Sequence, residues 1–169
     1  MKEVYLAGGC FWCISDYLLS FHGIKDVIVG YSGGNEKEVS YEDVKHQLTG
    51  HRETVKVIYK EEEISLEEII DIYLSYIDPL DKDGQYIDKG FSYTCALYFQ
   101  NEDEKNLFIL KVNKLKEELN QEIYIKVEPL KFFIEAESYH QHYGDKNPEA
   151  FKEELEKSHR SCHLVRKKN

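Results

Sequence analysis

Short hydrophobic runs alternate with amphipathic stretches along the whole chain. Runs rich in β-branched, aliphatic and aromatic residues, some of them alternating with polar positions, predict β-strands. These strands are expected at residues 4–6, 24–31, 54–59, 93–99 and 125–133. Apolar residues spaced three and four apart predict helices between the strands. The helices are expected at 11–21, from 41, from 65 to the proline at 79, at 101–119 and at 148–157.

Local signals mark the ends of several of these helices. Ser65 and Glu68 form a capping box, and Asn101 can cap the long helix that follows it. Ser40 is a candidate cap for a short helix beginning at Tyr41. The mixed order of strands and helices predicts an α+β fold, a two-layer sandwich with a central mixed or largely antiparallel sheet flanked by helices.

Length and composition limit the kinds of protein this chain can be. A chain of 169 residues, without an internal repeat or a linker rich in proline and glycine, predicts a single domain over 1–169. Apolar residues make up 41% and aromatic residues 13%, which is enough for a core and argues against intrinsic disorder. The formal charge of −10 argues against a nucleic-acid partner.

The expected compartment is the cytoplasm. No apolar run approaches the roughly 18 residues that a membrane-spanning helix needs. The first residues, Met1-Lys2-Glu3, lead directly into a predicted strand, so no signal peptide is expected. Four cysteines in a reducing compartment are more often catalytic, metal-binding or buried than joined in a disulfide framework.

Two of the cysteines stand in the segment Gly8-Gly9-Cys10-Phe11-Trp12-Cys13. The glycines allow a tight turn, so Cys10 is expected at the first turn of a helix, where backbone N–H groups and the helix dipole favour its thiolate. The Cys-x-x-Cys spacing has three interpretations: a redox pair, half of a zinc site, or coincidence. Further zinc ligands would have to come from Cys162, His159, His163 or the pair His140 and His142.

Motifs along most of the chain resemble one family. The sequence GGCFWC at 8–13, with GYSGG at 30–34, is similar to the A-type peptide methionine sulfoxide reductases (MsrA). The resemblance extends from about residue 4 to 151, and its further motifs are YEDV at 41–44, TGHRE at 49–53, DP at 78–79, GQ…DKG…SY at 84–93 and AESYHQ at 136–141.

The resemblance implies a thiol-dependent reductase that converts methionine S-sulfoxide, free or in proteins, to methionine. Cys10 would attack the sulfoxide sulfur and become a sulfenic acid, which a second thiol condenses to a disulfide. Tyr31 and Tyr93 match the tyrosines that donate hydrogen bonds to the sulfoxide oxygen, and Asp88 matches the carboxylate that orders the site. The aromatic wall around the substrate methyl group matches Phe11 and Trp12.

The resemblance further implies an enzyme without metal or cofactor that is recycled by thioredoxin or another dithiol. Nothing in the sequence demands more than a monomer. The resemblance leaves the resolving thiol open between Cys13 and Cys162, the latter in a C-terminal tail at 158–169 that is expected to be mobile. Alternatives are a general thiol–disulfide oxidoreductase running on Cys10 and Cys13, and a non-catalytic zinc-binding module.

The proton donor is the main departure from the family. Most members carry a glutamate at the position of Ser15, so the resemblance leaves open which group protonates the sulfoxide oxygen. Two tyrosines with a nearby carboxylate such as Glu137 are the candidates for this role. His51 and Glu53 are taken as turn residues rather than catalytic ones, and Cys95 as a buried, inert thiol.

Overall fold

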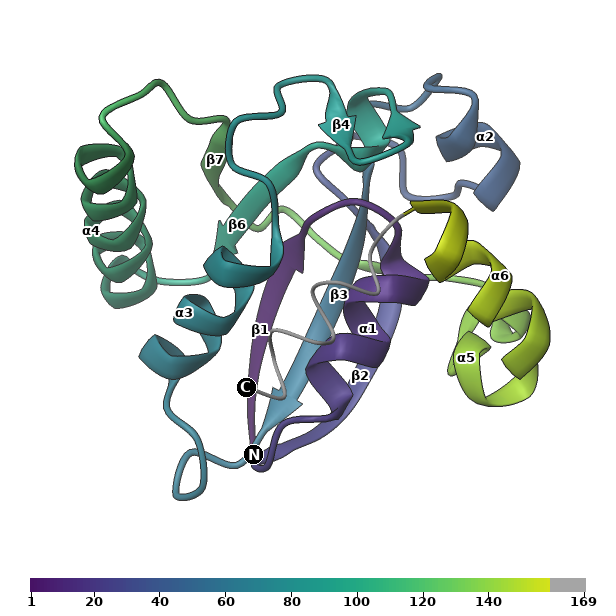
Figure 1. Cartoon of the computed structure of the whole chain (residues 1–169), viewed down its shortest axis with the longest axis horizontal. Coiled ribbons are helices and arrows are strands. Elements are labelled where there is room, and N and C mark those ends of the chain that lie inside the picture. The colour runs from purple at the N-terminus through teal and green to yellow at the C-terminus, as the bar shows by residue number, and fades with distance from the viewer. Residues whose placement is uncertain (159–169) are drawn as a thin grey trace.

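The computed structural model describes residues 1–158 and is built on a six-stranded sheet (Figure 1). The sheet has the order β7-β6-β1-β3-β2-β8, in which β6 and β7 are parallel and the other neighbours are antiparallel. This arrangement confirms the predicted α+β class with a mixed, largely antiparallel sheet. The strands are β1 (Lys2–Ala7), β2 (Ile24–Ser32), β3 (Arg52–Tyr59), β6 (Cys95–Phe99), β7 (Ile125–Pro129) and β8 (Ile134–Glu135).

The helices follow the predicted order. They are α1 (Phe11–Leu19), α2 (Tyr41–Lys45), α3 (Leu66–Tyr76), α4 (Glu102–Leu119), α5 (Tyr143–Lys146) and α6 (Pro148–Ser158). The predicted caps are confirmed, because the side chains of Ser40, Ser65 and Asn101 each accept a hydrogen bond from the backbone amide three residues later. These local bonds fix where α2, α3 and α4 begin.

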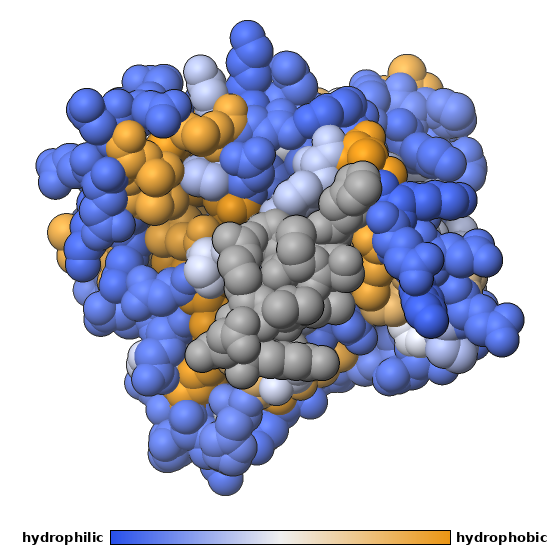
Figure 2. Space-filling model, viewed as in Figure 1, coloured by the Kyte–Doolittle hydropathy of each residue, from blue (hydrophilic) through white to orange (hydrophobic). Residues whose placement is uncertain are grey.

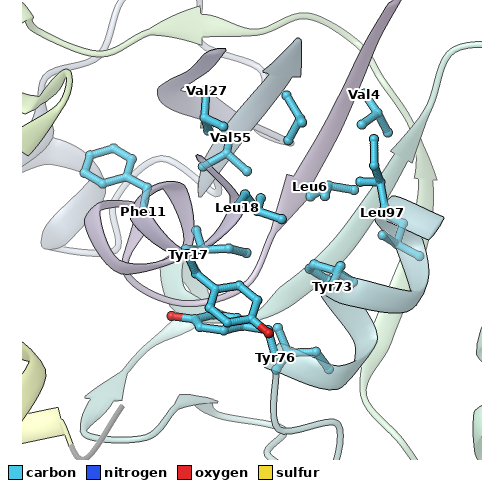
Figure 3. Close-up of a cluster of buried hydrophobic side chains, with 14 of the residues drawn as sticks. Val4, Leu6, Phe11, Tyr17, Leu18, Val27, Val55, Tyr73, Tyr76 and Leu97 are labelled. Atoms are coloured by element: carbon cyan, nitrogen blue, oxygen red, sulfur yellow. The ribbon is translucent and has the colours of Figure 1, made fainter. Parts of the chain in front are cut away.

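The main core lies between one face of the sheet and the helices α1, α3 and α4. Successive strand residues point to opposite faces, so Val4 and Leu6 of β1 face the helices whereas Tyr5 and Ala7 face away. Figure 3 shows side chains of α1 and α3 meeting those of the strands in this core. Phe11, the first residue of α1, belongs to the same core, which anchors the start of that helix.

The opposite face of the sheet is partly covered by the segment that joins β7 to β8. Phe133 of this segment packs on Tyr5, with ring centroids 5.4 Å apart. The prediction of one strand over 125–133 is therefore wrong: the chain leaves the β7 edge and reaches the other edge of the sheet as β8. Pro129 lies at the break, where it has no N–H group to continue a ladder.

The segment predicted as a polar loop before β6 contains ordered structure that positions side chains. A small hairpin pairs β4 (Gly84–Gln85) with β5 (Asp88–Lys89), and the 3₁₀ turn η1 (Phe91–Tyr93) follows. Gln85 is fully buried and its side-chain amide exchanges two hydrogen bonds with the backbone of Asp78. The strand predicted from 93 accordingly begins at Cys95.

Polar side chains cover most of the surface in Figure 2, and hydrophobic ones gather beside α4 on this face. Among the helices within residues 1–158, none is both long and apolar enough to cross a membrane. The tail predicted at 158–169 lies, apart from the last residue of α6, outside the described residues.

Candidate active site around Cys10

Cys10 immediately precedes α1. Its backbone is extended, with φ −61° and ψ 121°, and its carbonyl oxygen accepts a hydrogen bond from the amide of Cys13 at 3.2 Å. Gly9 has φ +82°, a left-handed conformation that glycine adopts readily. At Gly8 a Cβ atom would lie 2.7 Å from Cγ2 of Ile77, so only glycine fits. The turn thus places Cys10 at the helix N-terminus, as the sequence predicts.

Glu53 of β3 reaches the same helix N-terminus from the sheet. Its Oε1 atom accepts a hydrogen bond from the amide of Phe11 at 3.0 Å, and the residue is only 2% exposed. The N–H groups at a helix N-terminus have no partner within the helix, which explains why a carboxyl oxygen is held here as an acceptor. A buried carboxyl group beside a nucleophilic cysteine has the placement that a general acid requires.

Two tyrosines and a second carboxylate lie around this pair. Burial raises the pKa of Tyr41 and of Tyr93, and the charges of Glu53, Cys10 and Asp88 raise both values further. The same three groups act electrostatically on both phenols, so the five residues lie near one another. Both phenols are protonated at neutral pH and can donate hydrogen bonds to an oxygen atom near Cys10.

Tyr31 lies next to this site but its hydroxyl group is engaged elsewhere. Its side chain is fully buried, and the hydroxyl donates to Oε1 of Glu137 at 2.8 Å. The other oxygen of Glu137 accepts from the backbone amide of Tyr41 at 3.0 Å. Burial raises the pKa of Glu137, but hydrogen bonds from backbone amides and from Tyr31 outweigh it and lower the value. Tyr31 and Glu137 therefore hold the first residue of α2 in place.

Phe11 and Trp12 form an aromatic surface beside Cys10. The Phe11 ring is fully buried and lies 6.2 Å from the ring of Tyr41, whereas Trp12 is half-buried. Trp12 is stacked on Tyr143 of α5, with a centroid distance of 3.8 Å and an interplanar angle of 7°. Trp12 also lies 6.3 Å from Tyr41 between ring centroids, and because it is only partly buried it offers apolar surface that a small methyl group can contact.

The other cysteines have different surroundings. Cys13 is 2% exposed and packs with Cys10 and Phe151 of α6. Cys95 on β6 is 1% exposed, and burial raises its pKa to about 12, in agreement with the prediction of an inert thiol. Cys162 lies outside the described residues, so its resolving role stays a prediction.

Ser15 does not contribute a proton donor. It is buried in α1, and its Oγ atom donates to the carbonyl oxygen of Trp12 at 3.1 Å. The acid that the family pattern lacks at Ser15 has a candidate on β3 instead, namely Glu53.

Over residues 1–158, no group of three or more His, Cys, Asp and Glu side chains is arranged to hold a metal ion.

The sequence analysis predicted Cys10, Tyr93 and Asp88 for this site, and the structure brings them together. It missed Glu53 and Tyr41. A signal for Glu53 was available, because it stands two residues before Val55 on β3 and so shares the buried face of that strand. A carboxyl group at a core-facing position is a functional signal, since such groups are rarely buried without a partner.

Comparisons with known proteins identify the family of the chain. A family model described as "Peptide methionine sulfoxide reductase" matches residues 2–169. The chain is 44% identical over 151 residues to the peptide methionine sulfoxide reductase MsrA of Clostridium botulinum (strain Kyoto / Type A2), covering 88% of this chain and 94% of that protein. The resemblance inferred from the motifs is confirmed.

Solved structures are similar as well. The crystal structure of Mxr1 from Saccharomyces cerevisiae in reduced form is 32% identical, with a TM-score of 0.80 over 88% of this chain and 86% of that one. The structure of Mxr1 in complex with Trx2 has a TM-score of 0.52 at 23% identity and covers 84% of each chain.

Proposed function

This chain belongs to the peptide methionine sulfoxide reductase family, whose thiol-dependent reaction reduces methionine S-sulfoxide to methionine, and we propose that Cys10 carries that reaction in a site completed by Glu53, Tyr41, Tyr93 and Asp88. The observation that carries this assignment is the placement of Cys10 at the N-terminus of α1, with the buried Glu53 bonded to the next amide. This placement stabilises a thiolate and puts a proton source beside it.

In the first step the Cys10 thiolate attacks the sulfoxide sulfur. The sulfur becomes sufficiently electrophilic only when its oxygen is hydrogen-bonded or protonated. Tyr41 and Tyr93 donate hydrogen bonds to that oxygen, and Glu53 delivers the proton. The protonated oxygen is then transferred from the sulfoxide sulfur to the sulfur of Cys10, as its bond to the sulfoxide sulfur breaks and a new S–O bond forms. Methionine leaves with its sulfur reduced by two electrons, and Cys10, oxidised by two electrons, is left as a sulfenic acid. Asp88 orders the phenols through its charge.

Trp12 binds the methyl group of the substrate, and the buried Phe11 ring lies behind it, 6.5 Å away between ring centroids. The methyl group is the only small apolar substituent on the sulfoxide sulfur, and Trp12 offers a partly exposed apolar surface for it. Contact of the methyl group with this surface orients the sulfur toward Cys10. Free and protein-bound methionine sulfoxide share the group that this surface binds, so both are substrates in this proposal.

The sulfenic acid is resolved by a second thiol. Condensation of the Cys10 sulfenic acid with a thiol forms a disulfide and releases water. Cys13 is three residues along and packs against Cys10, which places one candidate at hand. Cys162 is the other candidate, and a relay through both is compatible with the chemistry.

Thioredoxin or another dithiol then reduces the disulfide by exchange. The structure of the relative Mxr1 in complex with Trx2 supports a thioredoxin-type partner. The cycle needs no prosthetic group, since its electrons come from thiols. A compartment that keeps thiols reduced, such as the cytoplasm, suits this cycle, and we propose that the protein acts there as a monomer.

A single-turnover assay without reductant tests the proposal. Reduced protein is mixed with an excess of methionine S- or R-sulfoxide, and the methionine formed and the thiols lost are counted by mass spectrometry with peptide mapping. We expect about one methionine per chain from the S form alone, with Cys10 linked to Cys13 or Cys162.

Parallel Cys13→Ser and Cys162→Ser variants identify the resolving thiol. Both should still form methionine in the first turnover, and the variant that lacks the resolving thiol should lose turnover with thioredoxin. If the parent protein forms methionine from neither the S form nor the R form, the assignment of Cys10 as a reductase nucleophile is refuted.

A further inference from the structure

His140 is a buried histidine that the proposed reaction leaves without a role. It belongs to the 3₁₀ turn η2 (Ser138–His140) and is 1% exposed. Its Nδ1 atom lies 3.0 Å from Nε1 of Trp12, in a hydrogen bond between the two rings. Its Nε2 atom is buried and has no hydrogen-bond partner among the described residues.

The chemistry of the two rings fixes the protonation state of His140. The indole Nε1–H of Trp12 can only donate, so Nδ1 of His140 must accept. The neutral imidazole then carries its proton on Nε2. A protonated imidazolium has hydrogen on both nitrogens, which would set two N–H donors against each other across 3.0 Å.

We propose that neutral His140, as its Nε2–H tautomer, is a positioning residue that holds the Trp12 ring in place for the sulfoxide, and that protonation of His140 releases this ring. The inference rests on the proposed role of Trp12 in binding the substrate methyl group. His140 touches neither the reacting sulfur nor Cys10 in this mechanism; it acts through Trp12.

The rings packed around His140 and Trp12 explain why one hydrogen bond can hold the indole ring in place. Tyr41 and Tyr139 lie 4.4 and 4.1 Å from it between ring centroids, and Phe11 lies 5.3 Å away. Trp12 is held from its other side by stacking on Tyr143. Loss of the hydrogen bond to His140 leaves that stack as the main specific restraint on the indole ring.

The titratable groups around His140 come from four parts of the fold. Glu137 and Tyr139 belong to its own segment, Tyr41 comes from α2, Cys10 precedes α1, and Glu53 comes from β3 and is bonded to the amide of Phe11. Burial lowers the pKa of His140, and the charge of Glu137 opposes this shift only in part.

Compared with Glu137, Tyr41 and Tyr139, His140 is the group expected to change its protonation state in mildly acidic solution. The pKa of Glu137 is also lowered, so that carboxylate stays charged over the range in which His140 takes up a proton. The pKa values of Tyr41 and Tyr139 are raised, first of all by burial, so both phenols stay neutral there. Binding of the sulfoxide should therefore weaken as the pH falls below the ordinary range of histidine.

The first test needs no variant. Nitrogen-15 NMR of the histidine rings at pH 7 distinguishes the two neutral tautomers and the imidazolium. We expect His140 as the neutral Nε2–H tautomer. An Nδ1–H tautomer or an imidazolium at pH 7 would overturn the inference whether or not any variant folds.

The second test uses fluorescence, because Trp12 is the single tryptophan of the chain. Its emission should change in one step below about pH 6.5 as His140 is protonated. His140→Asn places an amide oxygen where Nδ1 lies and so keeps an acceptor for Trp12 without a titrating ring. The step should disappear in this variant.

His142→Asn is the matched control. It makes the same substitution two residues away, on an exposed histidine whose φ of +53° asparagine tolerates. This control should keep the fluorescence step. Persistence of the step in His140→Asn, or its loss in His142→Asn, would contradict the role of His140.

The third test measures substrate binding from single-turnover rates at increasing concentrations of methionine S-sulfoxide. His140→Leu removes the acceptor and should raise the half-saturating concentration about tenfold at pH 7, with a smaller change in the saturating rate. His140→Asn should restore binding close to that of the parent and flatten its pH dependence. Equal binding by parent and His140→Leu would refute the inference.

These outcomes separate this inference from the proposed function. If the parent protein forms no methionine, the proposed function fails, whereas the NMR and fluorescence results still decide whether His140 positions Trp12. If the parent is active and the His140 variants bind sulfoxide as it does, only the inference fails.

Discussion

Cys10 and Cys95 are both buried thiols, but their surroundings give them opposite chemistry. Cys95 is 1% exposed on β6, and burial raises its pKa to about 12, so it stays a neutral thiol. Cys10 is 7% exposed and stands at the N-terminus of α1, with Glu53 bonded to the following amide. Both thiols are buried, so the difference between them depends on what surrounds each sulfur atom.

The difference lies in what replaces water around each sulfur atom. Around Cys95 the replacement is the hydrophobic core, which disfavours a charge. Around Cys10 it is a helix N-terminus, whose unsatisfied N–H groups favour a charge, together with two phenols and a carboxyl group that can act on a bound oxygen. The strand-to-helix turn supplies the first feature, and long-range packing supplies the second.

The largest expected effect is on Cys10 itself. Cys10→Ser should form no methionine in the single-turnover assay, since a hydroxyl group does not attack the sulfoxide sulfur at neutral pH. The matched variant Cys95→Ser should keep its single-turnover rate within about twofold and lose about 1 kcal/mol of unfolding free energy. Activity that survives in Cys10→Ser and vanishes in Cys95→Ser would reverse the comparison.

The second prediction concerns Glu53, whose carboxyl group is bonded to the amide that follows Cys10. Glu53→Gln keeps an oxygen that can accept from the Phe11 amide but removes the proton donor. We expect the single-turnover rate to fall by about 100-fold or more, in line with the loss of a general acid. Glu42→Gln, which alters an exposed carboxylate next to Tyr41, serves as its control and should keep the rate.

A result in which both glutamate variants keep the parent rate would mean that the tyrosines alone supply the proton. Rates are best measured from pH 5 to pH 9, because a general acid should leave its own limb in the profile.

The third and smallest predicted effect distinguishes Tyr41 from Tyr31 as the donor to the sulfoxide oxygen. Tyr41→Phe should lower the single-turnover rate about tenfold, as expected for one lost hydrogen bond to the reacting oxygen. Tyr31→Phe should leave the rate nearly unchanged and lower the unfolding free energy by about 1 kcal/mol, because it removes the bond to Glu137. The opposite ranking would return the catalytic role to Tyr31, as the sequence analysis predicted.

Features that depend only on neighbours in the chain could be predicted from the sequence. The caps at Ser40, Ser65 and Asn101 are local hydrogen bonds, so a few residues suffice to predict them. The turn at Gly8 and Gly9 likewise follows from residue type, and it places Cys10 at a helix start. The family was evident from motifs for the same reason, since each motif is a short contiguous segment.

The side chains that gather around Cys10 and Trp12 are brought together by tertiary packing. Glu53, Tyr41 and His140 come from β3, α2 and η2, far apart in the chain, and their convergence depends on strand register and on the packing of loops. None of these three residues stands out within its own segment. Glu53, for example, lies two residues after His51 and was interpreted as a turn residue. Their chemistry arises from burial against one another, which local sequence does not encode.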